Sequence, residues 1–184
     1  MADLEDILRQ RHTVREFIPQ QSIPKEELDD MITLASLAPS ALNKQPLRYL
    51  TIDTPAARQQ LLQLADFNQT QIKTASSLVL IAADLVNNEV PAFTAGNAPE
   101  KVAPTKLTNL ALDAGLAGMQ LMLVAQNRGY VTNVMTGFDH EHILSALKLD
   151  QKRYHPFLLI AIGKSHDKGQ AVEHKSLNKI LLHR

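Results

Sequence analysis

The pattern of hydrophobic and polar positions predicts helices that cover a few buried strands. Residues 4–8 place apolar side chains at helical spacing before the polar stretch 9–13, so we expect a short N-terminal helix that leads into a basic loop. A second helix should begin near Pro24, because proline suits a first turn, and should stop before Pro39. Its apolar face consists of Leu28, Met31, Ile32 and Ala35.

Four segments have the character of strands: 48–52, 78–83, 130–135 and 157–162. The second is an unbroken apolar run, which is typical of a strand buried on both faces, and we expect the fourth to be buried as well. A turn at 53–55 introduces another helix, and Asp139 should cap a short helix before the last strand.

The segment from about 105 to 127 predicts a long helix that is apolar on nearly all sides. Small residues would let another helix approach it closely: Ala114, Gly115, Ala117 and Gly118. A helix without a polar face needs cover on every side, so we expect a subunit interface here. Leu107–Ala125 comes nearest to a membrane span, but lipid would penalise its polar side chains, and we expect a buried helix instead. These polar side chains are Asn109, Asp113 and Gln120.

Helices before, between and after a few buried strands predict an α+β fold, an α/β sandwich in which helices cover a sheet. The order of the elements fits no simple βαβ alternation. A chain of 184 residues, 45% of them hydrophobic, can form one compact domain over residues 1–184. Residues 85–104 form a loop that is too long for a simple connector, and such loops often act as lids.

Composition narrows the functional classes. Nineteen basic and nineteen acidic residues cancel, so we expect neither nucleic acid nor a membrane surface as a partner. The absence of cysteine excludes disulfides, thiolate catalysis and thiolate metal sites. Residues 1–4 lack the charged and then apolar order of a secretory signal, and we therefore expect a cytoplasmic protein.

The common nucleotide-binding and hydrolase motifs do not occur. None of the seven glycines forms G-x-G-x-x-G or a P-loop, and neither H-E-x-x-H nor G-x-S-x-G is found. A nucleotide phosphate would therefore have to be held by side chains. Segment 11–15, Arg-His-Thr-Val-Arg, offers two guanidiniums, an imidazole and a hydroxyl, and guanidinium forks match phosphate oxygens. By itself, the same composition is also typical of a solvated helix end.

Segment 38–46 is a second candidate site. Two prolines stiffen it, while Ser40, Asn43 and Gln45 offer hydroxyl and amide groups that can bond the donor and acceptor edges of a heterocycle. Taken alone, this composition is also that of an ordinary turn.

Other polar and sulfur-containing positions are interpreted as structural. Residues 140–142, His-Glu-His, have no third ligand at a recognisable spacing, so we expect a solvent-facing helix start rather than a metal site. Met119 and Met122 should be packing residues, because methionine fills irregular gaps in a core. Asp113 could be the buried partner of a basic residue, and we assign it no catalytic role.

Together, in this order and about 25 residues apart, segments 11–15 and 38–46 resemble the nitroreductase family of flavoproteins. In that family an N-terminal R-x-S-x-R/K-type motif grips the phosphate and ribityl chain of FMN. An A-P-S-x-x-N-x-Q-P-type motif from the partner subunit packs beside the flavin. The resemblance implies a mostly antiparallel sheet flanked by helices in an intertwined homodimer, with FMN as cofactor and NAD(P)H as electron donor.

The resemblance extends over nearly the whole chain. Segment 67–71 resembles the family segment that contacts the isoalloxazine ring, and segment 135–138 resembles the loop whose backbone amide faces flavin N5. Segments 113–117 and 128–130 resemble the start and the end of the long interface helix. The residues that the resemblance assigns to cofactor binding are Arg11, His12, Thr13, Arg15, Pro39, Ser40, Ala41, Asn43, Gln45, Asn68, Gln71, Met135, Thr136, Gly137, His174 and Lys175. It assigns no catalytic side chain, because the flavin would carry the chemistry.

The chain also departs from the family pattern. Gln71 stands where many members have a lysine near the flavin pyrimidine edge, and Leu47 replaces a common tryptophan. Thr136 replaces a common acidic residue before the glycine near N5, and the C-terminal K-x-R phosphate clamp is represented only by His174-Lys175. Loop 85–104 is shorter than the insertion of larger members, which implies a more open pocket.

The resemblance implies an oxidoreductase that carries electrons from NAD(P)H to small oxidants, such as nitroaromatics or quinones, by a ping-pong mechanism. The sequence leaves two alternatives open: a non-catalytic flavin-binding module for sensing or storage, and a dimer without a cofactor. Related folds also dehalogenate or cleave aromatic substrates through the same flavin, and the sequence does not exclude that chemistry.

Overall fold

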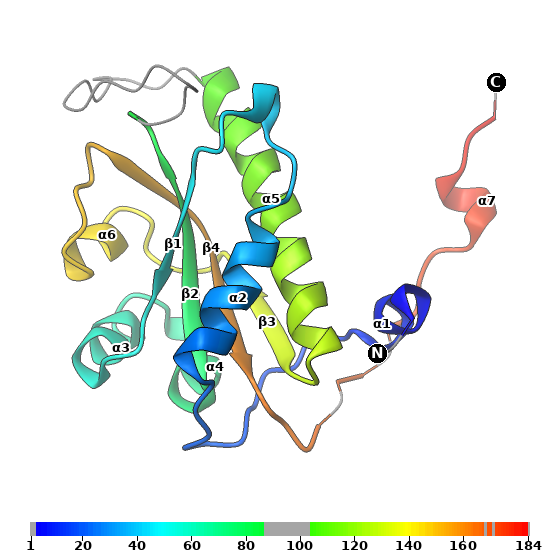
Figure 1. Cartoon of the computed structure of the whole chain (residues 1–184), viewed down its shortest axis with the longest axis horizontal. Coiled ribbons are helices and arrows are strands. Elements are labelled where there is room, and N and C mark those ends of the chain that lie inside the picture. The colour runs from blue at the N-terminus through cyan, green and yellow to red at the C-terminus, as the bar shows by residue number, and fades with distance from the viewer. Residues whose placement is uncertain (1–2, 87–103, 168, 171, 184) are drawn as a thin grey trace.

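One antiparallel sheet forms the centre of the computed structural model, with helices on both of its faces (Figure 1). The structure describes residues 3–86, 104–167, 169–170 and 172–183. The strands are β1 (Leu47–Thr51), β2 (Ser77–Asp84), β3 (Val131–Met135) and β4 (Tyr154–Gly163). Their order in the sheet is β1-β2-β4-β3, and every neighbouring pair is antiparallel. The predicted α+β class and antiparallel sheet are therefore confirmed.

The two central strands explain why the sequence contains unbroken apolar runs. Every residue of β2 is buried, and successive side chains of a strand point to opposite faces of the sheet. Leu78 and Leu80 enter one hydrophobic core, whereas Val79 and Ile81 enter the other. Because both faces are covered, a strand that alternated polar and apolar residues would bury its polar groups. The prediction that this strand is buried on both faces is confirmed.

The helices divide into two layers. On one face of the sheet lie α2 (Lys25–Ala35) and α5 (Pro104–Asn127), and on the other lie α3 (Pro55–Leu62), α4 (Gln69–Thr74) and α6 (Ile143–Ala146). Two 3-10 turns, η1 (Ala41–Asn43) and η2 (Asp66–Asn68), precede β1 and α4. In Figure 1, α1 (Leu4–Gln10) and α7 (Leu177–Ile180) lie away from the sheet, on the same side of the molecule.

Local signals place the starts of the helices well. Helix α2 begins directly after Pro24, buries Met31 completely and ends at Ala35, before Pro39 as expected. Thr54 caps α3, because its hydroxyl accepts the backbone N–H of Ala57 at 3.2 Å. His142 occupies the N-cap position of α6, and Asp139 caps the turn that leads into this helix, because its carboxylate accepts the N–H groups of Glu141 at 2.9 Å and His142 at 3.0 Å.

The small residues of α5 have different surroundings. Ala114 is buried in the core that α5 shares with the sheet and α2, and Ala117 is buried as well. A Cβ on Gly115 would meet nothing within 4 Å. A Cβ on Gly118 would lie 2.8 Å from Cδ1 of Leu158 in β4. Gly118 therefore lets α5 approach the sheet, whereas the sequence suggested contact with a further helix. The exposed hydrophobic residues of α5 are Leu112, Leu116 and Met119.

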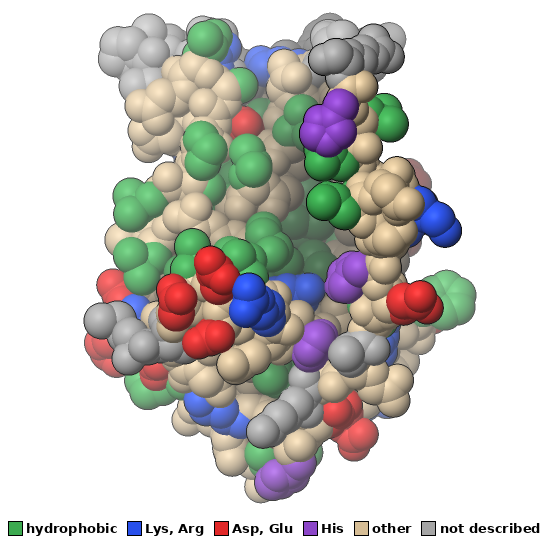
Figure 2. Space-filling view, turned by 90° about the vertical axis from the view of Figure 1, so that its right-hand side faces the viewer, with side chains coloured by type: hydrophobic (Ala, Val, Ile, Leu, Met, Phe, Trp, Pro, Cys, Tyr) green, Lys and Arg blue, Asp and Glu red, His purple; other side chains and the backbone are tan. Residues whose placement is uncertain are grey.

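Hydrophobic side chains gather on the face that Figure 1 turns to the right (Figure 2). An 18-residue window within residues 106–127 of α5 has a mean hydropathy of 1.3, and the length and composition of this helix would suffice to cross a membrane. The core helix of a soluble protein has the same properties. Contact of α5 with the sheet and α2 accounts for the apolar residues on its buried side. The window is 39% buried, so the predicted buried helix is only partly covered in the single chain.

The sequence predicted a lid that the structure does not describe, and it missed one helix. The proposed lid at 85–104 lies outside the described residues except for its ends. Helix α4 was not expected, because the sequence Gln-Thr-Gln-Ile-Lys-Thr carries one large apolar residue and no clear helical period. That residue, Ile72, is fully buried and fixes the helix on the sheet.

Candidate functional site

The basic segment after α1 is held against the edge of the sheet. Thr13 forms a parallel bridge with Thr132 of β3, and the N–H of Val14 donates to the Thr132 carbonyl at 3.1 Å. Val14 is buried, as is Phe17 further along. Because side chains alternate in extended backbone, burial of Val14 turns Thr13 and Arg15 to the opposite side.

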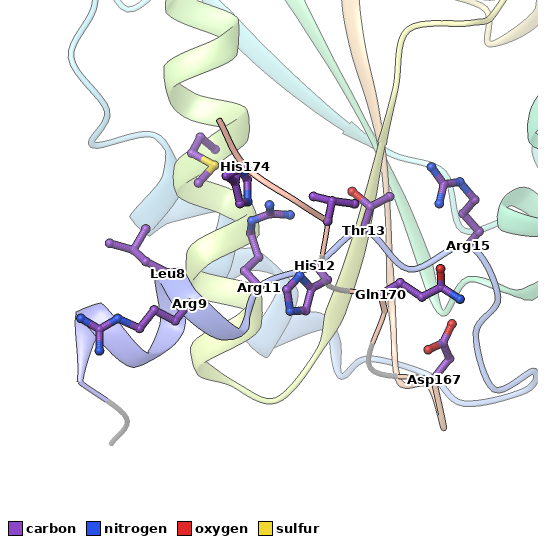
Figure 3. A pocket seen from close by; sticks show the side chains of 11 residues that line it. Leu8, Arg9, Arg11, His12, Thr13, Arg15, Asp167, Gln170 and His174 are labelled. Carbon is purple, nitrogen blue, oxygen red and sulfur yellow. The ribbon is translucent and has the colours of Figure 1, made fainter. Parts of the chain in front are cut away.

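These side chains line a cavity of about 880 Å³ (Figure 3). Three parts of the chain supply its walls: the N-terminal segment, helix α5 and the C-terminal segment. The lining residues are Leu8, Arg9, Arg11, His12, Thr13, Arg15, Met119, Asp167, Gln170, Val172 and His174. Five residues that the sequence assigned to phosphate binding therefore meet here, whereas Lys175 does not line the cavity.

The charges around this cavity suit an anion. Arg9 is paired with Glu5 at 2.8 Å. Arg11 and Arg15 have no hydrogen-bond or ion-pair partner within the described part of the chain, and Asp167 is the single carboxylate among the described lining residues. Two guanidiniums that have no protein partner and face one cavity provide the donors that a phosphate requires. The residues present therefore fit the phosphate end of a nucleotide.

A second group of predicted residues comes together at the other end of β3. The Asn68 side-chain amide donates to the Gly137 carbonyl at 2.9 Å, and the Gln71 amide donates to the Asn68 side-chain oxygen at 3.4 Å. Gln71 is buried at the start of α4. These contacts fix two segments that are 69 residues apart in the sequence.

Arg58 holds α4 in place beneath this group. Its guanidinium donates to the carbonyls of Ile72 at 3.2 Å, Ala75 at 2.7 Å and Ser76 at 2.9 Å. These carbonyls lie at and just beyond the end of α4, where a helix leaves acceptors unsatisfied. Burial lowers the pKa of Arg58, yet guanidinium remains charged in proteins. The arginine thereby stabilises the helix that carries Gln71.

Strand β3 separates the two groups by a defined distance. Thr13 is paired with Thr132, and Gly137 follows five residues later. An extended chain rises about 3.3 Å per residue, so the two groups lie up to about 16 Å apart. A ligand with an anionic end and a polar ring at the other end would fit along this edge of the sheet.

Segment 38–46 forms a third group, which no described contact joins to the other two. The N–H of Ala41 donates to the Asp113 carboxylate of α5 at 3.1 Å, and the Ser40 hydroxyl accepts the N–H of Gln45 at 3.0 Å. The Gln45 amide also donates to the side chain of Asn43 at 3.1 Å. Asp113 thus has a backbone partner, where a basic side chain was considered. The expectation that this segment serves the partner subunit's cofactor stays a prediction.

The structure adds residues that sequence reasoning missed. Met119, expected to be a packing residue, lines the cavity, whereas Met122 is packed in the core as predicted. Asp167 and Gln170 also line it. Asp167 also accepts the N–H of Gly169 at 2.8 Å. An Asp two residues before a Gly is a signal that the sequence offers, but the segment against which these residues pack is not.

The remaining predicted positions lie around Gly137. The Met135 side chain is buried in the core, so only its backbone is available to a ligand. Thr136 is exposed and its carbonyl oxygen lies 3.0 Å from Nε2 of His140. Residues 140–142 are exposed, and the described residues contain no group of metal-ligating side chains. The expected solvent-facing position of residues 140–142 is confirmed.

Comparisons with known proteins identify the family of the chain. The sequence profile of the nitroreductase family matches residues 8–164. The chain is 36% identical to YdgI of Bacillus subtilis, named as a candidate NAD(P)H nitroreductase, over 92% of this chain and 91% of that protein. It is 36% identical to the CLA biosynthesis enone reductase of Lactiplantibacillus plantarum, over 89% and 86% of the two chains.

A solved structure shares the fold. The crystal structure of a candidate nitroreductase in complex with FMN, from Exiguobacterium sibiricum, superposes with a TM-score of 0.88 at 31% identity. The match covers 100% of this chain and 98% of that one. On the match of the family profile and on these relatives, the chain belongs to the nitroreductase family of oxidoreductases.

Proposed function

We propose that the cavity and the adjoining edge of β3 bind FMN. The observation that carries this proposal is the pair of guanidiniums of Arg11 and Arg15, which face the cavity without a described protein partner. Polar groups of Asn68 and Gly137 stand at the far end of the same strand. The FMN complex of the Exiguobacterium sibiricum relative supports the identity of the ligand.

Different side chains bind different parts of FMN. Arg11 and Arg15 hold the phosphate, because two guanidinium forks can satisfy several of its oxygens, and the hydroxyl of Thr13 contacts the ribityl chain. Asn68 and Gln71 meet the edge of the ring system. When bound, FMN supplies the hydride chemistry, and the protein positions it and excludes side reactions.

NAD(P)H and the oxidant use the same open site in turn, by a ping-pong mechanism. No side chain has to act as an acid or base in this proposal, so activity depends on how closely each substrate is aligned. Aligned reactants gain roughly 7–11 kcal/mol over a free encounter. The name of YdgI supports NAD(P)H as the donor.

The oxidant is a small molecule with an electron-poor group. Nitroaromatics and quinones are the first candidates, and the similarity to the Lactiplantibacillus plantarum enone reductase adds conjugated ketones. We propose further that the active form is a homodimer in which Pro39, Ser40, Ala41, Asn43 and Gln45 reach the partner's flavin. The exposed hydrophobic residues on α5 supply an apolar surface for that contact.

The visible absorption spectrum of the purified protein, recorded before and after anaerobic addition of NADPH, tests the function. A flavin band that bleaches supports the proposal, and oxidation of NADPH by a nitroaromatic, a quinone or an enone then identifies the oxidant class. A flavin band that persists favours the flavin-binding module without turnover. No band after incubation with FMN contradicts FMN binding itself.

The double variant Arg11→Ala with Arg15→Ala tests the assignment of the phosphate. We expect a folded protein that no longer retains FMN, because no other pair of unpartnered guanidiniums lines the described cavity. The matched control is Lys25→Ala with Lys152→Ala, which removes the same charge at exposed positions away from the cavity. Equal FMN occupancy in both double variants would refute the assignment.

A further inference from the structure

Two side chains hold two consecutive carbonyl groups in the loop that follows β3. Nε2 of His140 lies 3.0 Å from the carbonyl oxygen of Thr136, and the Asn68 amide donates to the carbonyl of Gly137 at 2.9 Å. A carbonyl oxygen only accepts hydrogen bonds, so Nε2 of His140 carries the proton in this contact. The loop is therefore fixed from two directions.

The contact with His140 decides where one backbone amide points. The carbonyl of Thr136 and the N–H of Gly137 belong to the same peptide unit, and in a planar trans peptide they point in opposite directions. With the carbonyl turned to His140, the N–H of Gly137 is turned away from it. Within the described chain this N–H donates no hydrogen bond, so it is left available to a ligand.

The imidazole of His140 is itself held in place. Its ring stacks on Phe138 with centroids 4.1 Å apart and an interplanar angle of 26°. Phe138 is anchored in the core, with 8% of its surface exposed. An exposed histidine thus has a fixed position, because one face lies on a buried ring and one nitrogen bonds the backbone.

We propose that His140 is a positioning residue that aims the Gly137 N–H at the bound flavin. This inference rests on the proposed function. The imidazole does not touch the flavin in this role; it acts through the Thr136 carbonyl, so that the amide donor is already oriented before FMN arrives. Such preorganisation strengthens binding, because the loop does not have to be ordered when the ligand binds.

Two variants separate the hydrogen bond from the ring. His140→Phe keeps an aromatic ring to stack on Phe138 but removes the donor, whereas His140→Gln keeps an N–H donor without the ring. We expect the Kd for FMN to rise about three- to tenfold in His140→Phe, the range for one hydrogen bond. We expect His140→Gln to recover most of that loss.

The NMR resonance of the Gly137 amide, recorded without FMN, gives a readout that does not depend on the cofactor. His140→Phe should shift this resonance, and His140→Gln should return it toward the wild-type position. His142→Phe is the matched control, since His142 bonds Asp139 and not the Thr136 carbonyl. It should leave the Gly137 resonance and the Kd for FMN unchanged.

The outcomes are distinct. An unchanged Gly137 resonance and an unchanged Kd in His140→Phe overturn the positioning role while leaving the proposed function intact. Equal losses in His140→Phe and His140→Gln also overturn it, because the imidazole and not its hydrogen bond would then matter. Failure of the wild-type protein to bind FMN overturns the proposed function and this role together.

Discussion

Gly169 lies so close to His12 that a side chain at position 169 would clash with it. A Cβ on Gly169 would lie 2.5 Å from Cβ of His12 and 3.2 Å from the carbonyl oxygen of Thr13. The φ angle of Gly169 is +80°, in the left-handed region that glycine adopts readily. The C-terminal segment therefore closes the cavity only because residue 169 has no side chain.

Gly169→Ala should weaken both folding and FMN binding. The methyl group would push the C-terminal segment off the phosphate-binding segment, and the strained φ angle adds a cost of about 1 kcal/mol or more to the folded state. We expect a lower free energy of unfolding in urea and a raised Kd for FMN.

Gly129→Ala is the control for this prediction. Gly129 also has a positive φ, +72°, but its Cβ would meet only the flexible end of Lys164, at 3.3 Å. It should lose stability with no change in the Kd for FMN. If both variants bind FMN as the wild type does, the C-terminal segment has no part in the site.

Leu116→Glu should dissociate the proposed homodimer. Leu116 is 50% exposed on the outer side of α5 in the single chain, and leucine and glutamate have similar helix propensities. The single chain should therefore tolerate the change within about 0.5 kcal/mol. In a dimer that packs α5 against a second copy, the carboxylate would be buried without a partner.

Sedimentation velocity measures the effect on the dimer. We expect the wild type to sediment as a dimer and Leu116→Glu as a monomer with an unchanged circular dichroism spectrum. Ala56→Glu places the same charge on the exposed surface of α3, on the opposite face of the sheet, and should stay dimeric. A Leu116→Glu dimer as tight as the wild type would place the interface elsewhere.

The hydrogen bond between Asp139 and His142 should shift the pKa values of both side chains in opposite directions. Nδ1 of His142 lies 2.7 Å from the Asp139 carboxylate, and this hydrogen bond raises the pKa of His142 above 6.5 and lowers the pKa of Asp139 below 3.8. The contribution of His142 is present below pH 6.5 and is lost as pH rises through its raised pKa. The contribution of Asp139 is present above pH 3.8 and is lost as pH falls through its lowered pKa.

Both contributions are fully present between pH 3.8 and pH 6.5, so the turn is most stable in that range. An NMR titration of the imidazole resonances should place the pKa of His142 above 6.5, and Asp139→Asn should bring it back toward that value. The pKa of His155, lowered by burial and by the nearby His140, should stay below 6.5 in both proteins. A His142 pKa that does not respond to Asp139→Asn would contradict the pairing.

Much of the secondary structure follows from local pattern. The apolar run 78–83 predicted β2, since a strand covered on both faces has no polar positions to alternate. Thr54 and Pro55 marked the start of α3 because a cap and a first-turn proline act within a few residues. Helix α4 was not predicted because its stability comes from the burial of Ile72 and from hydrogen bonds that Arg58 donates. Both depend on residues outside the six-residue segment.

The sequence by itself determined the chemistry of the candidate site. Two arginines, a threonine and a histidine at 11–15 supply the donors that an anion would need, because their charges and hydrogen-bonding groups belong to the side chains. The family resemblance also follows from the order of motifs along the chain.

Only the tertiary structure decided which distant residues share the site. Met119 reaches the cavity, and Gly118 contacts the sheet, because the packing of α5 sets its rotation about its own axis. Asn68 bonds Gly137 because the start of α4 lies beside the end of β3. Such contacts depend on three-dimensional packing, which local spacing in the sequence does not encode.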